Sequence, residues 1–593
     1  MTRRVPRCAG LLAMAVAATG VANAADAAIA TGALPARVLD RTFLFGREQP
    51  SAPLPMREFT PPASASAPLH TIEGRITLSR EALLGAMQIW RDDYGTSKAA
   101  SEILRHLPGF DFEFVTSGDA LIPVRRGSIE SRHPQWEFVL EPGRLWTSPE
   151  DDGLTRAALP FSLEERNANC LHNGVMTFLF DATGRISRVA YQVSSETCAY
   201  LKLDLWGVLP ARYRPAPIAQ AGEIRAAYAR EVAARLPTRP IEALAAAYPG
   251  ANPAAFGSPE EVPREDMTAY GFVIDGVHYV GGCDTRAGPY PFCDVLDLPS
   301  YSLAKSLVAG LGSLALARDL PGLLDERIAD WVPACKAAGG WDDVRFRDAL
   351  DMATGHFDST RYDEDEKSSA MLPFFIAEDH LTKIEFACRH FPRRAAPGTQ
   401  WVYHTIDTYL LGTALEAFVK RRLGANRDFY RDVVVAKLWA PLGLSPVLRE
   451  TRRTRDLAAQ PFTGWGLTLH RDDIARIGAW LAAPQLQAIG GIQPFAGHEL
   501  DIALQRDPVN RGLRAIDDSF RYARGFWAHD VSRYIACAHP VWVPYMAGFG
   551  GINVLLLPNG TVYYYFSDGE AYRWATAAAE AHRIRPYCGK ASS

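Results

Sequence analysis

Residues 302–316 read Ser-Leu-Ala-Lys-Ser-Leu-Val-Ala-Gly-Leu-Gly-Ser-Leu-Ala-Leu. Ser302 and Lys305 are three residues apart, which places their side chains on one face of a helix, one turn from each other. The apolar run that follows predicts that this helix is buried. Burial lowers the pKa of a lysine, and a neutral amine can take the proton of a serine hydroxyl and activate it as a nucleophile. The same residues can also be the ordinary start of a buried helix.

The length and composition of the chain are those of a globular protein with more than one domain. It has 593 residues, of which 48% are hydrophobic, and a formal net charge of −4. A chain of this length can bury two cores. Acidic and basic residues are mixed along it, and it has no basic stripe and no nucleic-acid-binding motif. We therefore expect a small-molecule or short-oligomer substrate and no nucleic-acid partner.

The first 24 residues have the pattern of a secretory signal peptide. Three early arginines precede an apolar, alanine-rich stretch at 9–22, and Ala22-Asn23-Ala24 is a small-x-small cleavage pattern. The apolar stretch is too short to span a bilayer. We expect cleavage after Ala24, a periplasmic or secreted location, and no membrane span once the signal is removed.

Eight cysteines follow the predicted signal peptide, an even number that suits an oxidising compartment. Because eight cysteines allow many connectivities, any pairing rests on proximity in the sequence. Pairing each cysteine with its next neighbour gives Cys170–Cys198, Cys283–Cys293, Cys335–Cys388 and Cys537–Cys588. Their spacings match no zinc motif, and we expect no metal site and no cofactor.

The patterns of strands and helices divide the chain near residue 260. We expect an irregular segment at 25–70, a β-rich N-terminal domain at 71–215, a helical linker at 216–264 and a larger domain at 265–593. The larger domain begins with two strands joined by an Asp275-Gly276 turn. Helical segments follow, and strands return at 523–568 before a terminal helix. This order predicts an α/β sandwich whose sheet joins both ends of the domain.

Three blocks of the larger domain resemble the serine β-lactamase and penicillin-binding-protein superfamily, in particular its class C-like branch of esterases and 6-aminohexanoate-oligomer hydrolases. The first, Ser302-Leu303-Ala304-Lys305, is similar to the family's Ser-x-x-Lys. The second, residues 397–405, reads Pro-Gly-Thr-Gln-Trp-Val-Tyr-His-Thr and is similar to Pro-Gly-x-x-x-x-Tyr-x-Asn/Ser. The third, residues 548–551, stands where the family has Lys-Thr-Gly or another glycine-rich strand. The resemblance implies an α/β (α+β) sandwich of the β-lactamase/transpeptidase-like type over about 265–590.

The resemblance also implies a role for each matching side chain. Ser302 corresponds to the nucleophile that forms an acyl-enzyme, Lys305 to its base, and Tyr403 to a proton relay that serves the leaving group. The alternative for Tyr403 is a packed aromatic side chain beside Trp401.

An oxyanion hole is expected from two backbone N–H groups, those of Ser302 and Phe549. Gly548, Gly550 and Gly551 flank the second donor and let a substrate approach the strand closely. The alternative for these glycines is a bulged strand that turns a corner.

The chain departs from the family pattern at two places. Thr405 stands where many members have Asn, although its hydroxyl can still support the lysine or contact the substrate. Residues 545–548 read Tyr-Met-Ala-Gly and lack the lysine and threonine that hold a substrate carboxylate. We therefore expect an ester or amide substrate without that carboxylate, and neither a true β-lactamase nor a peptidoglycan carboxypeptidase. The acidic run 363–366 predicts a solvated loop, with the substrate entrance as the alternative location.

These observations predict an exported serine hydrolase of the β-lactamase-related esterase or amidase type. The alternative is a catalytically weak or silent family member that acts as a binding protein.

Overall fold

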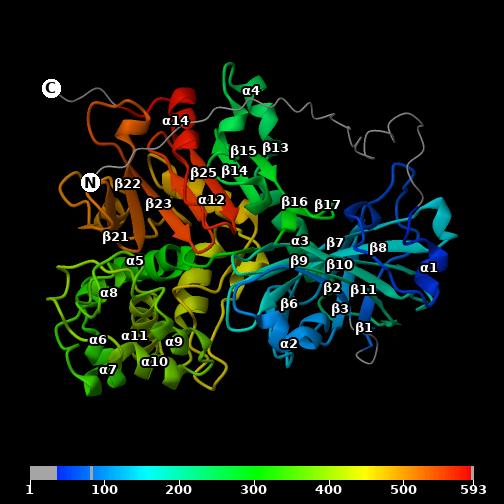
Figure 1. Cartoon of the computed structure of the whole chain (residues 1–593), viewed down its shortest axis with the longest axis horizontal. Coiled ribbons are helices and arrows are strands. Elements are labelled where there is room, and N and C mark those ends of the chain that lie inside the picture. The colour runs from blue at the N-terminus through cyan, green and yellow to red at the C-terminus, as the bar shows by residue number, and fades with distance from the viewer. Residues whose placement is uncertain (1–36, 80–84, 589–593) are drawn as a thin grey trace, which may run out of the picture. The chain divides into compact units, whose positions relative to one another are not determined.

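The first part of the chain folds into a twelve-stranded antiparallel sheet, here called the N-terminal sheet (Figure 1). The computed structural model describes residues 37–79 and 85–588, so the predicted signal peptide lies outside the described residues. Ten strands follow the order β12-β1-β3-β4-β7-β8-β9-β10-β11-β2, while β6 pairs with β8 and β5. Their bounds are β1 Glu73–Leu78, β2 Ala86–Asp92, β3 Asp111–Ser117, β4 Ala120–Pro123, β5 Ser128–Ile129, β6 Trp136–Leu140, β7 Gly143–Trp146, β8 Thr155–Glu165, β9 Leu171–Phe180, β10 Val189–Thr197, β11 Leu201–Leu209 and β12 Ala211–Pro215.

The central strands of this sheet are buried on both faces. Successive side chains of a strand point to opposite faces, and here they reach two different cores. Met176 packs in a core formed by the N-terminal sheet alone, whereas its neighbour Val175 packs in a core that continues into the second half of the chain. The segment before β1, which contains α1 (Arg41–Phe45), adds Leu39 and Leu44 to this shared core. From Leu39 onward the chain therefore forms one unit.

The second half of the chain, residues 265–588, is here called the C-terminal region. Its sheet has nine strands in the order β13-β15-β14-β25-β24-β23-β22-β21-β20, of which β13 comes from the preceding segment that the sequence predicted as a helical linker. Asp275 and Gly276 join β14 to β15 with positive φ angles of 50° and 73°, as the Asp-Gly turn predicts. β14 pairs with β25, so the sheet joins both ends of the region. The bounds are β13 Thr238–Pro240, β14 Met267–Ile274, β15 Val277–Gly282, β20 Leu513–Arg514, β21 Phe520–Ala523, β22 Phe526–Asp530, β23 Trp542–Gly548, β24 Ile552–Leu556 and β25 Val562–Ser567.

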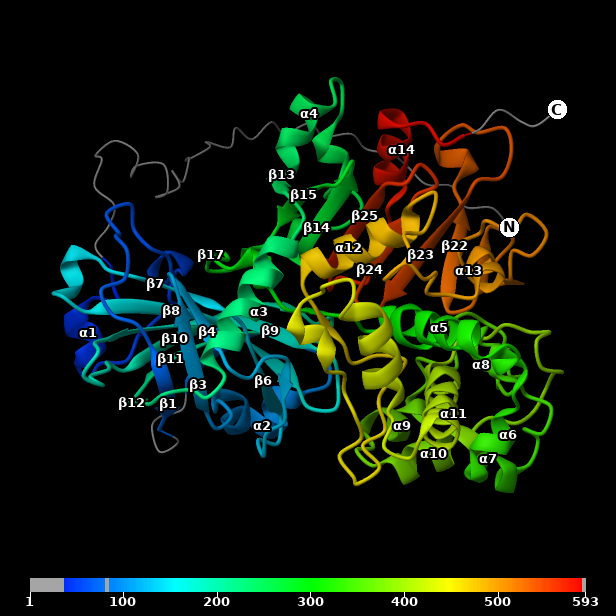
Figure 2. The same ribbon diagram turned by 180° about the vertical axis from the view of Figure 1, so that it is seen from behind.

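Helices cover both faces of this nine-stranded sheet (Figures 1 and 2). Tyr563 and Tyr565 of β25 share a core with α14 (Ala575–Ile584). Tyr564 and Phe566 point the other way, into the core that holds α12 (Arg471–Ala482). This alternation buries both faces and produces the predicted α/β sandwich.

A helical section lies between the two parts of the sheet in the sequence. It contains the π-helical turn η8 (Lys305–Gly310), which continues as α5 (Leu311–Asp319) and carries the predicted nucleophile motif at its start. The other helices of this section are α6 Ile328–Trp331, α7 Pro333–Ala338, α8 Phe346–Leu350, α9 Leu372–Ile376, α10 His380–Arg389, α11 Thr405–Leu423, η11 Tyr430–Trp439 and α13 Gly497–Ala503. Earlier in the chain lie α2 Thr96–Arg105, α3 Ala221–Ala234 and α4 Leu244–Ala247.

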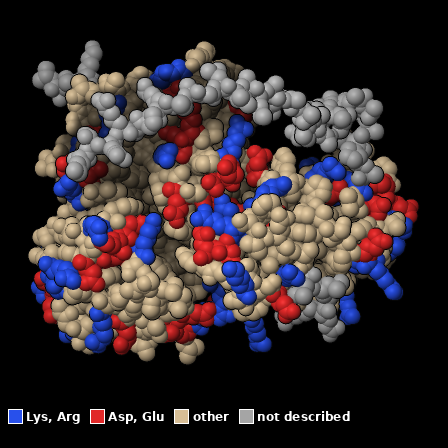
Figure 3. All heavy atoms as spheres, viewed as in Figure 1, with Lys and Arg blue, Asp and Glu red and all other residues tan. Residues whose placement is uncertain are grey.

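Four disulfides connect the pairs that the sequence analysis proposed. They are Cys170–Cys198, Cys283–Cys293, Cys335–Cys388 and Cys537–Cys588. In the described part of the chain, no helix combines the length and the apolar character needed to cross a membrane. Acidic and basic side chains are interspersed on the face shown in Figure 3, which agrees with the mixed charge of the sequence.

Candidate active site

Ser302 and Lys305 lie at the start of the buried helix that the sequence predicts. The short strand β18 (Leu298–Pro299) leads into them and pairs with β19 (Thr468–Leu469), which brings the 464–469 segment beside the motif. Lys305 is 2% exposed, and its Nζ lies 2.8 Å from Ser302 Oγ. The predicted hydroxyl–amine pair is therefore in hydrogen-bond contact.

The amine of Lys305 has two more polar neighbours. It donates to Thr405 Oγ1 at 2.9 Å and to the carbonyl oxygen of Gly464 at 3.2 Å. Burial lowers the pKa of Lys305 to about 8, although the carboxylates of Glu366 and Asp363 act in the opposite direction. The unprotonated amine, which a general base requires, is therefore far more populated near neutral pH than in an exposed lysine.

Tyr403 lies across from the lysine, directly before α11. Ser302 interacts with its hydroxyl in the direction that lowers the pKa of Tyr403, and Lys305 Nζ lies 5.1 Å from the centre of its ring. The ring also stacks on Trp527 at 5.8 Å. Burial among these rings raises the pKa of Tyr403 well above its usual value, with Glu366 adding to the increase. The side chain is therefore a neutral phenol at rest, able to give a proton but not to take one.

The glycine-rich block lies beside the loop that carries Ser302. A Cβ added to Gly548, the last residue of β23, would lie 2.9 Å from the carbonyl oxygen of Ser300, so the two backbones are in close contact. The ring of Phe549 lies 5.6 Å from that of Tyr301. Gly550 and Gly551 have φ angles of +88° and +99° and form the turn between β23 and β24. Their role is conformational, because L side chains rarely adopt such angles.

The acidic run contributes to the site more directly than a solvated loop would. Asp365 is 5% exposed and lies 3.1 Å from His404 Nε2. Glu366 accepts a hydrogen bond from Thr405 N at 2.8 Å and a second from Thr405 Oγ1. The sequence analysis did not single out Glu366 as a site residue, because four consecutive acidic residues are typical of an exposed loop.

Asn169 is a second residue that the sequence analysis missed. It is 1% exposed and comes from the N-terminal sheet, in the connection between β8 and β9. Its Oδ1 accepts from the backbone N–H groups of Tyr301 at 2.7 Å and Gly466 at 3.2 Å, and from Ser300 Oγ at 3.2 Å. Tyr301 has a φ of 39°, which is rare for a residue with a side chain. Asn169 therefore holds an unusual backbone conformation directly before the nucleophile.

Among the described residues, three groups of side chains have the composition of metal ligands. In two of them, Cys170–His172–Cys198 and Cys537–His539–Cys588, the sulfurs are bonded to each other. The third is formed by Glu141, Asp297 and His470, and there Arg126 contacts the Glu141 carboxylate at 2.5 Å. His470 lies 3.4 Å from Glu141, and these carboxylates raise the pKa of its imidazole to about 10. This group is an ion-pair network between the N-terminal sheet and the C-terminal region.

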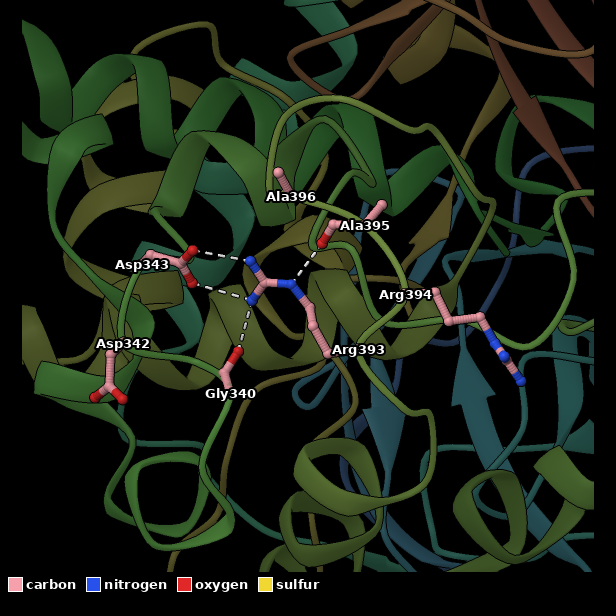
Figure 4. A pocket seen from close by; sticks show the side chains of 7 residues that line it. All are labelled: Gly340, Asp342, Asp343, Arg393, Arg394, Ala395 and Ala396. Carbon is pink, nitrogen blue, oxygen red and sulfur yellow. Dashed lines mark hydrogen bonds and ion pairs between the residues drawn. The ribbon is translucent and has the colours of Figure 1, made fainter.

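A surface hollow of about 540 Å³ lies apart from these residues and is lined by Gly340, Asp342, Asp343 and residues 393–396 (Figure 4). Its central guanidinium, that of Arg393, donates to Asp343 and to the carbonyl oxygens of Gly340 and Ala395. These partners take four of its five N–H groups, and Arg394, the other guanidinium of the lining, pairs with Asp358 and the carbonyl oxygen of Phe357. The hollow shares no lining residue with the site around Ser302.

Comparisons with known proteins bear on the C-terminal region. Residues 298–479 match the family model described as Beta-lactamase. A comparison with curated proteins found no match. Similar solved structures include a putative 6-aminohexanoate-dimer hydrolase from Bacillus anthracis, with 14% identity over 55% of this chain and 80% of that chain and a TM-score of 0.40. A family VIII carboxylesterase has 18% identity over 56% and 95% of the two chains and a TM-score of 0.39.

A class C β-lactamase has 13% identity over 54% of this chain and 90% of that chain and a TM-score of 0.37. The family match includes Ser302, Lys305 and Tyr403 but ends before the glycine-rich block. Over residues 298–479 the chain is therefore similar to the Beta-lactamase family, which agrees with the resemblance of the first two sequence blocks.

Proposed function

We propose that this protein is an exported serine hydrolase that cleaves an ester or an amide through an acyl-enzyme on Ser302. The observation that carries the proposal is the 2.8 Å contact between Ser302 Oγ and the amine of Lys305, whose pKa burial lowers to about 8. A hydroxyl beside a partly unprotonated amine is the arrangement that nucleophilic catalysis needs.

The reaction proceeds in two halves. Lys305 takes the Ser302 proton while Oγ bonds to the substrate carbonyl carbon, and the oxyanion forms between the backbone N–H groups of Ser302 and Phe549. The bond to the leaving group then breaks. Tyr403 gives its proton to the leaving group and regains one from the Lys305 ammonium. Water next attacks the acyl ester while its proton passes to Lys305. The bond between the acyl carbon and Ser302 Oγ then breaks, Lys305 returns the proton to Oγ, and the carboxylic acid leaves.

The proposed substrate has no carboxylate beside its reacting carbonyl. The residues at the family's lysine and threonine positions are Met546, which is fully buried, and Ala547. Neither can pair with an anion. Aromatic rings instead surround the site, since Trp401, Tyr403 and Trp527 form one contacting group. These features favour an ester or amide over a β-lactam.

A fluorophosphonate probe tests the mechanism because it bonds covalently to an activated serine. We expect labelling of the wild-type protein at Ser302, located by peptide mass spectrometry, and hydrolysis of short-chain nitrophenyl esters. The Ser302→Ala and Lys305→Ala variants should not be labelled. Labelling that persists in either variant contradicts the mechanism. A wild-type protein that is neither labelled nor active on these esters supports the alternative, a silent binding protein.

We also propose that the protein is exported to the periplasm or secreted. The predicted signal peptide and the four disulfides support this location, because disulfides persist in oxidising compartments. The mature protein recovered from the periplasm or medium should begin at Ala25 by N-terminal sequencing. Recovery in the cytoplasm, with an intact first residue, contradicts the proposal.

A further inference from the structure

A chain of hydrogen bonds leads from the acidic loop to the candidate nucleophile. It runs from Glu366 to the Thr405 hydroxyl, from there to Lys305 Nζ, and on to Ser302 Oγ. Glu366 also accepts from the backbone N–H of Thr405, so both of its carboxylate oxygens are bonded to this one residue. The carboxylate is therefore held in a fixed position relative to the threonine hydroxyl.

The direction of each hydrogen bond in this chain follows from the chemistry of the groups. An ionised carboxylate only accepts, so the Thr405 hydroxyl donates its single proton to Glu366. Thr405 Oγ1 can then only accept from Lys305. The carbonyl oxygen of Gly464, the other neighbour of Lys305 Nζ at 3.2 Å, also only accepts.

This count of protons leaves one arrangement for the unprotonated lysine. A neutral amine has two N–H groups and one lone pair. The two N–H groups are used by Thr405 Oγ1 and Gly464 O, so the lone pair is left for the remaining neighbour, Ser302 Oγ at 2.8 Å. A base that accepts the serine proton needs its lone pair in that direction.

We propose that Glu366 is a positioning residue that orients the Thr405 hydroxyl and so directs the lone pair of Lys305 toward Ser302. This inference rests on the proposed function, in which Lys305 is the base for Ser302. It assigns a role to Thr405, at the position where many family members have an asparagine, and to an acidic loop that is remote in sequence from the nucleophile.

The Glu366→Gln variant tests the proposal because it changes the direction of the hydrogen bonds at nearly constant shape. The glutamine oxygen accepts from Thr405 N, which turns the amide NH2 toward Thr405 Oγ1. The threonine hydroxyl then donates to Lys305 and occupies its lone pair. The rate of fluorophosphonate labelling at Ser302 should rise with pH and reach a plateau above the pKa of Lys305. We expect the rate on this high-pH plateau to fall about 10- to 100-fold in the variant.

In Glu366→Gln, the loss of the carboxylate charge and the altered direction of the hydrogen bonds change different parts of the pH–rate profile. The two effects can therefore be measured separately. The groups that face Lys305 are Glu366 and Asp363 from the acidic loop and the phenol of Tyr403. Asp407, whose pKa burial raises to about 7, is a further titratable group near Glu366. Loss of the Glu366 charge lowers the pKa of Lys305 and moves the acid limb of the rate profile to lower pH. An unchanged plateau with only this displacement overturns the orienting role.

Thr405→Val and the double variant show whether Glu366 acts through the hydroxyl. Thr405→Val keeps the carboxylate but removes the hydroxyl, and Thr405→Ser restores it. We expect Thr405→Val to lower the plateau about as much as Glu366→Gln, Thr405→Ser to recover most of it, and the double variant to be no slower than the slower single variant. A double variant whose loss of plateau rate equals the product of the two single losses contradicts the proposal.

Glu364→Gln is the matched control, since Glu364 lies on the same loop but pairs with Ser359 and Arg361. It should leave the plateau unchanged. If Glu366→Gln does not fold, the comparison of Thr405→Val with Thr405→Ser decides, because both keep Glu366, and equal rates in the two overturn the proposal. A wild-type protein that is not labelled refutes the proposed function, which is a different result from a labelled wild type with an unaffected Glu366→Gln plateau.

Discussion

Two buried lysines of the C-terminal region have similar burial but different neighbours. Lys305 contacts two hydroxyls and a carbonyl oxygen. Lys383 donates to the carbonyl oxygen of Phe374 at 2.6 Å and is surrounded by the rings of Phe374, Phe462 and Trp465 at 4.8–5.2 Å. Burial lowers the pKa to about 8 at Lys305 and to about 7 at Lys383. A lowered pKa therefore does not by itself mark a catalytic lysine, and the hydroxyl of Ser302 makes the difference.

Replacing each lysine by methionine should give the largest difference in activity between the surroundings of Lys305 and those of Lys383. Lys305→Met removes the base, and we expect ester hydrolysis to fall by at least about 10³-fold. Lys383→Met removes a buried amine that touches no reacting group, and its activity should stay close to that of the wild type. Steady-state hydrolysis of a nitrophenyl ester measures both. A Lys383→Met variant that is folded by circular dichroism but inactive contradicts the expectation that Lys383 takes no part in the reaction.

The ring beside Lys305 is that of Tyr403 and carries a hydroxyl, whereas the rings beside Lys383 carry none. Tyr403→Phe keeps the ring beside Lys305 but removes the proton donor, and we expect kcat to fall about 10²-fold with little change in stability. The matched control is Phe462→Tyr or another conservative change beside Lys383, which should leave kcat unchanged. An unaltered kcat in Tyr403→Phe contradicts the role of proton relay and supports the alternative, a packed aromatic side chain.

The N-terminal sheet supports the loop that carries the nucleophile through Asn169. Asn169→Ala leaves the buried N–H groups of Tyr301 and Gly466 without their acceptor, so we expect a loss of about 2 kcal/mol in the free energy of unfolding and about a tenfold lower kcat. Asn173 also crosses to the C-terminal region, where it donates to Asp297 O at 3.2 Å. Asn173→Ala should therefore lower stability but not kcat. Equal kcat values in the two variants contradict a positioning role for Asn169.

The lowered pKa of Lys383 should also change how the stability of the protein depends on pH. In the unfolded chain Lys383 titrates near 10.5, and in the folded protein near 7. Between these values the unfolded state binds more protons, so stability rises with pH through this window and the gain is absent below about pH 7. Lys383→Met should remove this rise, which is about 1.4 kcal/mol for each pH unit within the window, measured by denaturant unfolding. An equal rise in the variant and the wild type contradicts the lowered pKa of Lys383.

The sequence and the structure agree best where a local pattern carries the information. Ser302 and Lys305 are neighbours on one helix, and the Tyr403 block and the glycine-rich strand are recognisable by their own residues. The β14–β15 turn and the alternation of β25 follow from the same kind of short-range pattern.

Glu366 and Asn169 could not be predicted in the same way. Asn169 reaches Tyr301 across 132 positions of the sequence, and Glu366 reaches Thr405 across 39. Their contacts depend on how separate segments pack, and no spacing rule connects them. An asparagine is typical of a turn, where Asn169 does lie, and an acidic run is typical of solvent exposure, so neither pattern indicates a contact at the site.

The order of the four disulfides has a consequence for how the protein matures. The eight cysteines after the predicted signal peptide pair in sequential order, the first with the second, the third with the fourth and so on, at separations of 28, 10, 53 and 51 residues. A chain that enters an oxidising compartment from its N-terminus exposes both members of a pair before the first member of the next pair. Each bridge can then close in turn, and none has to be broken and remade by an isomerase. We therefore expect a simple oxidant to suffice for its maturation.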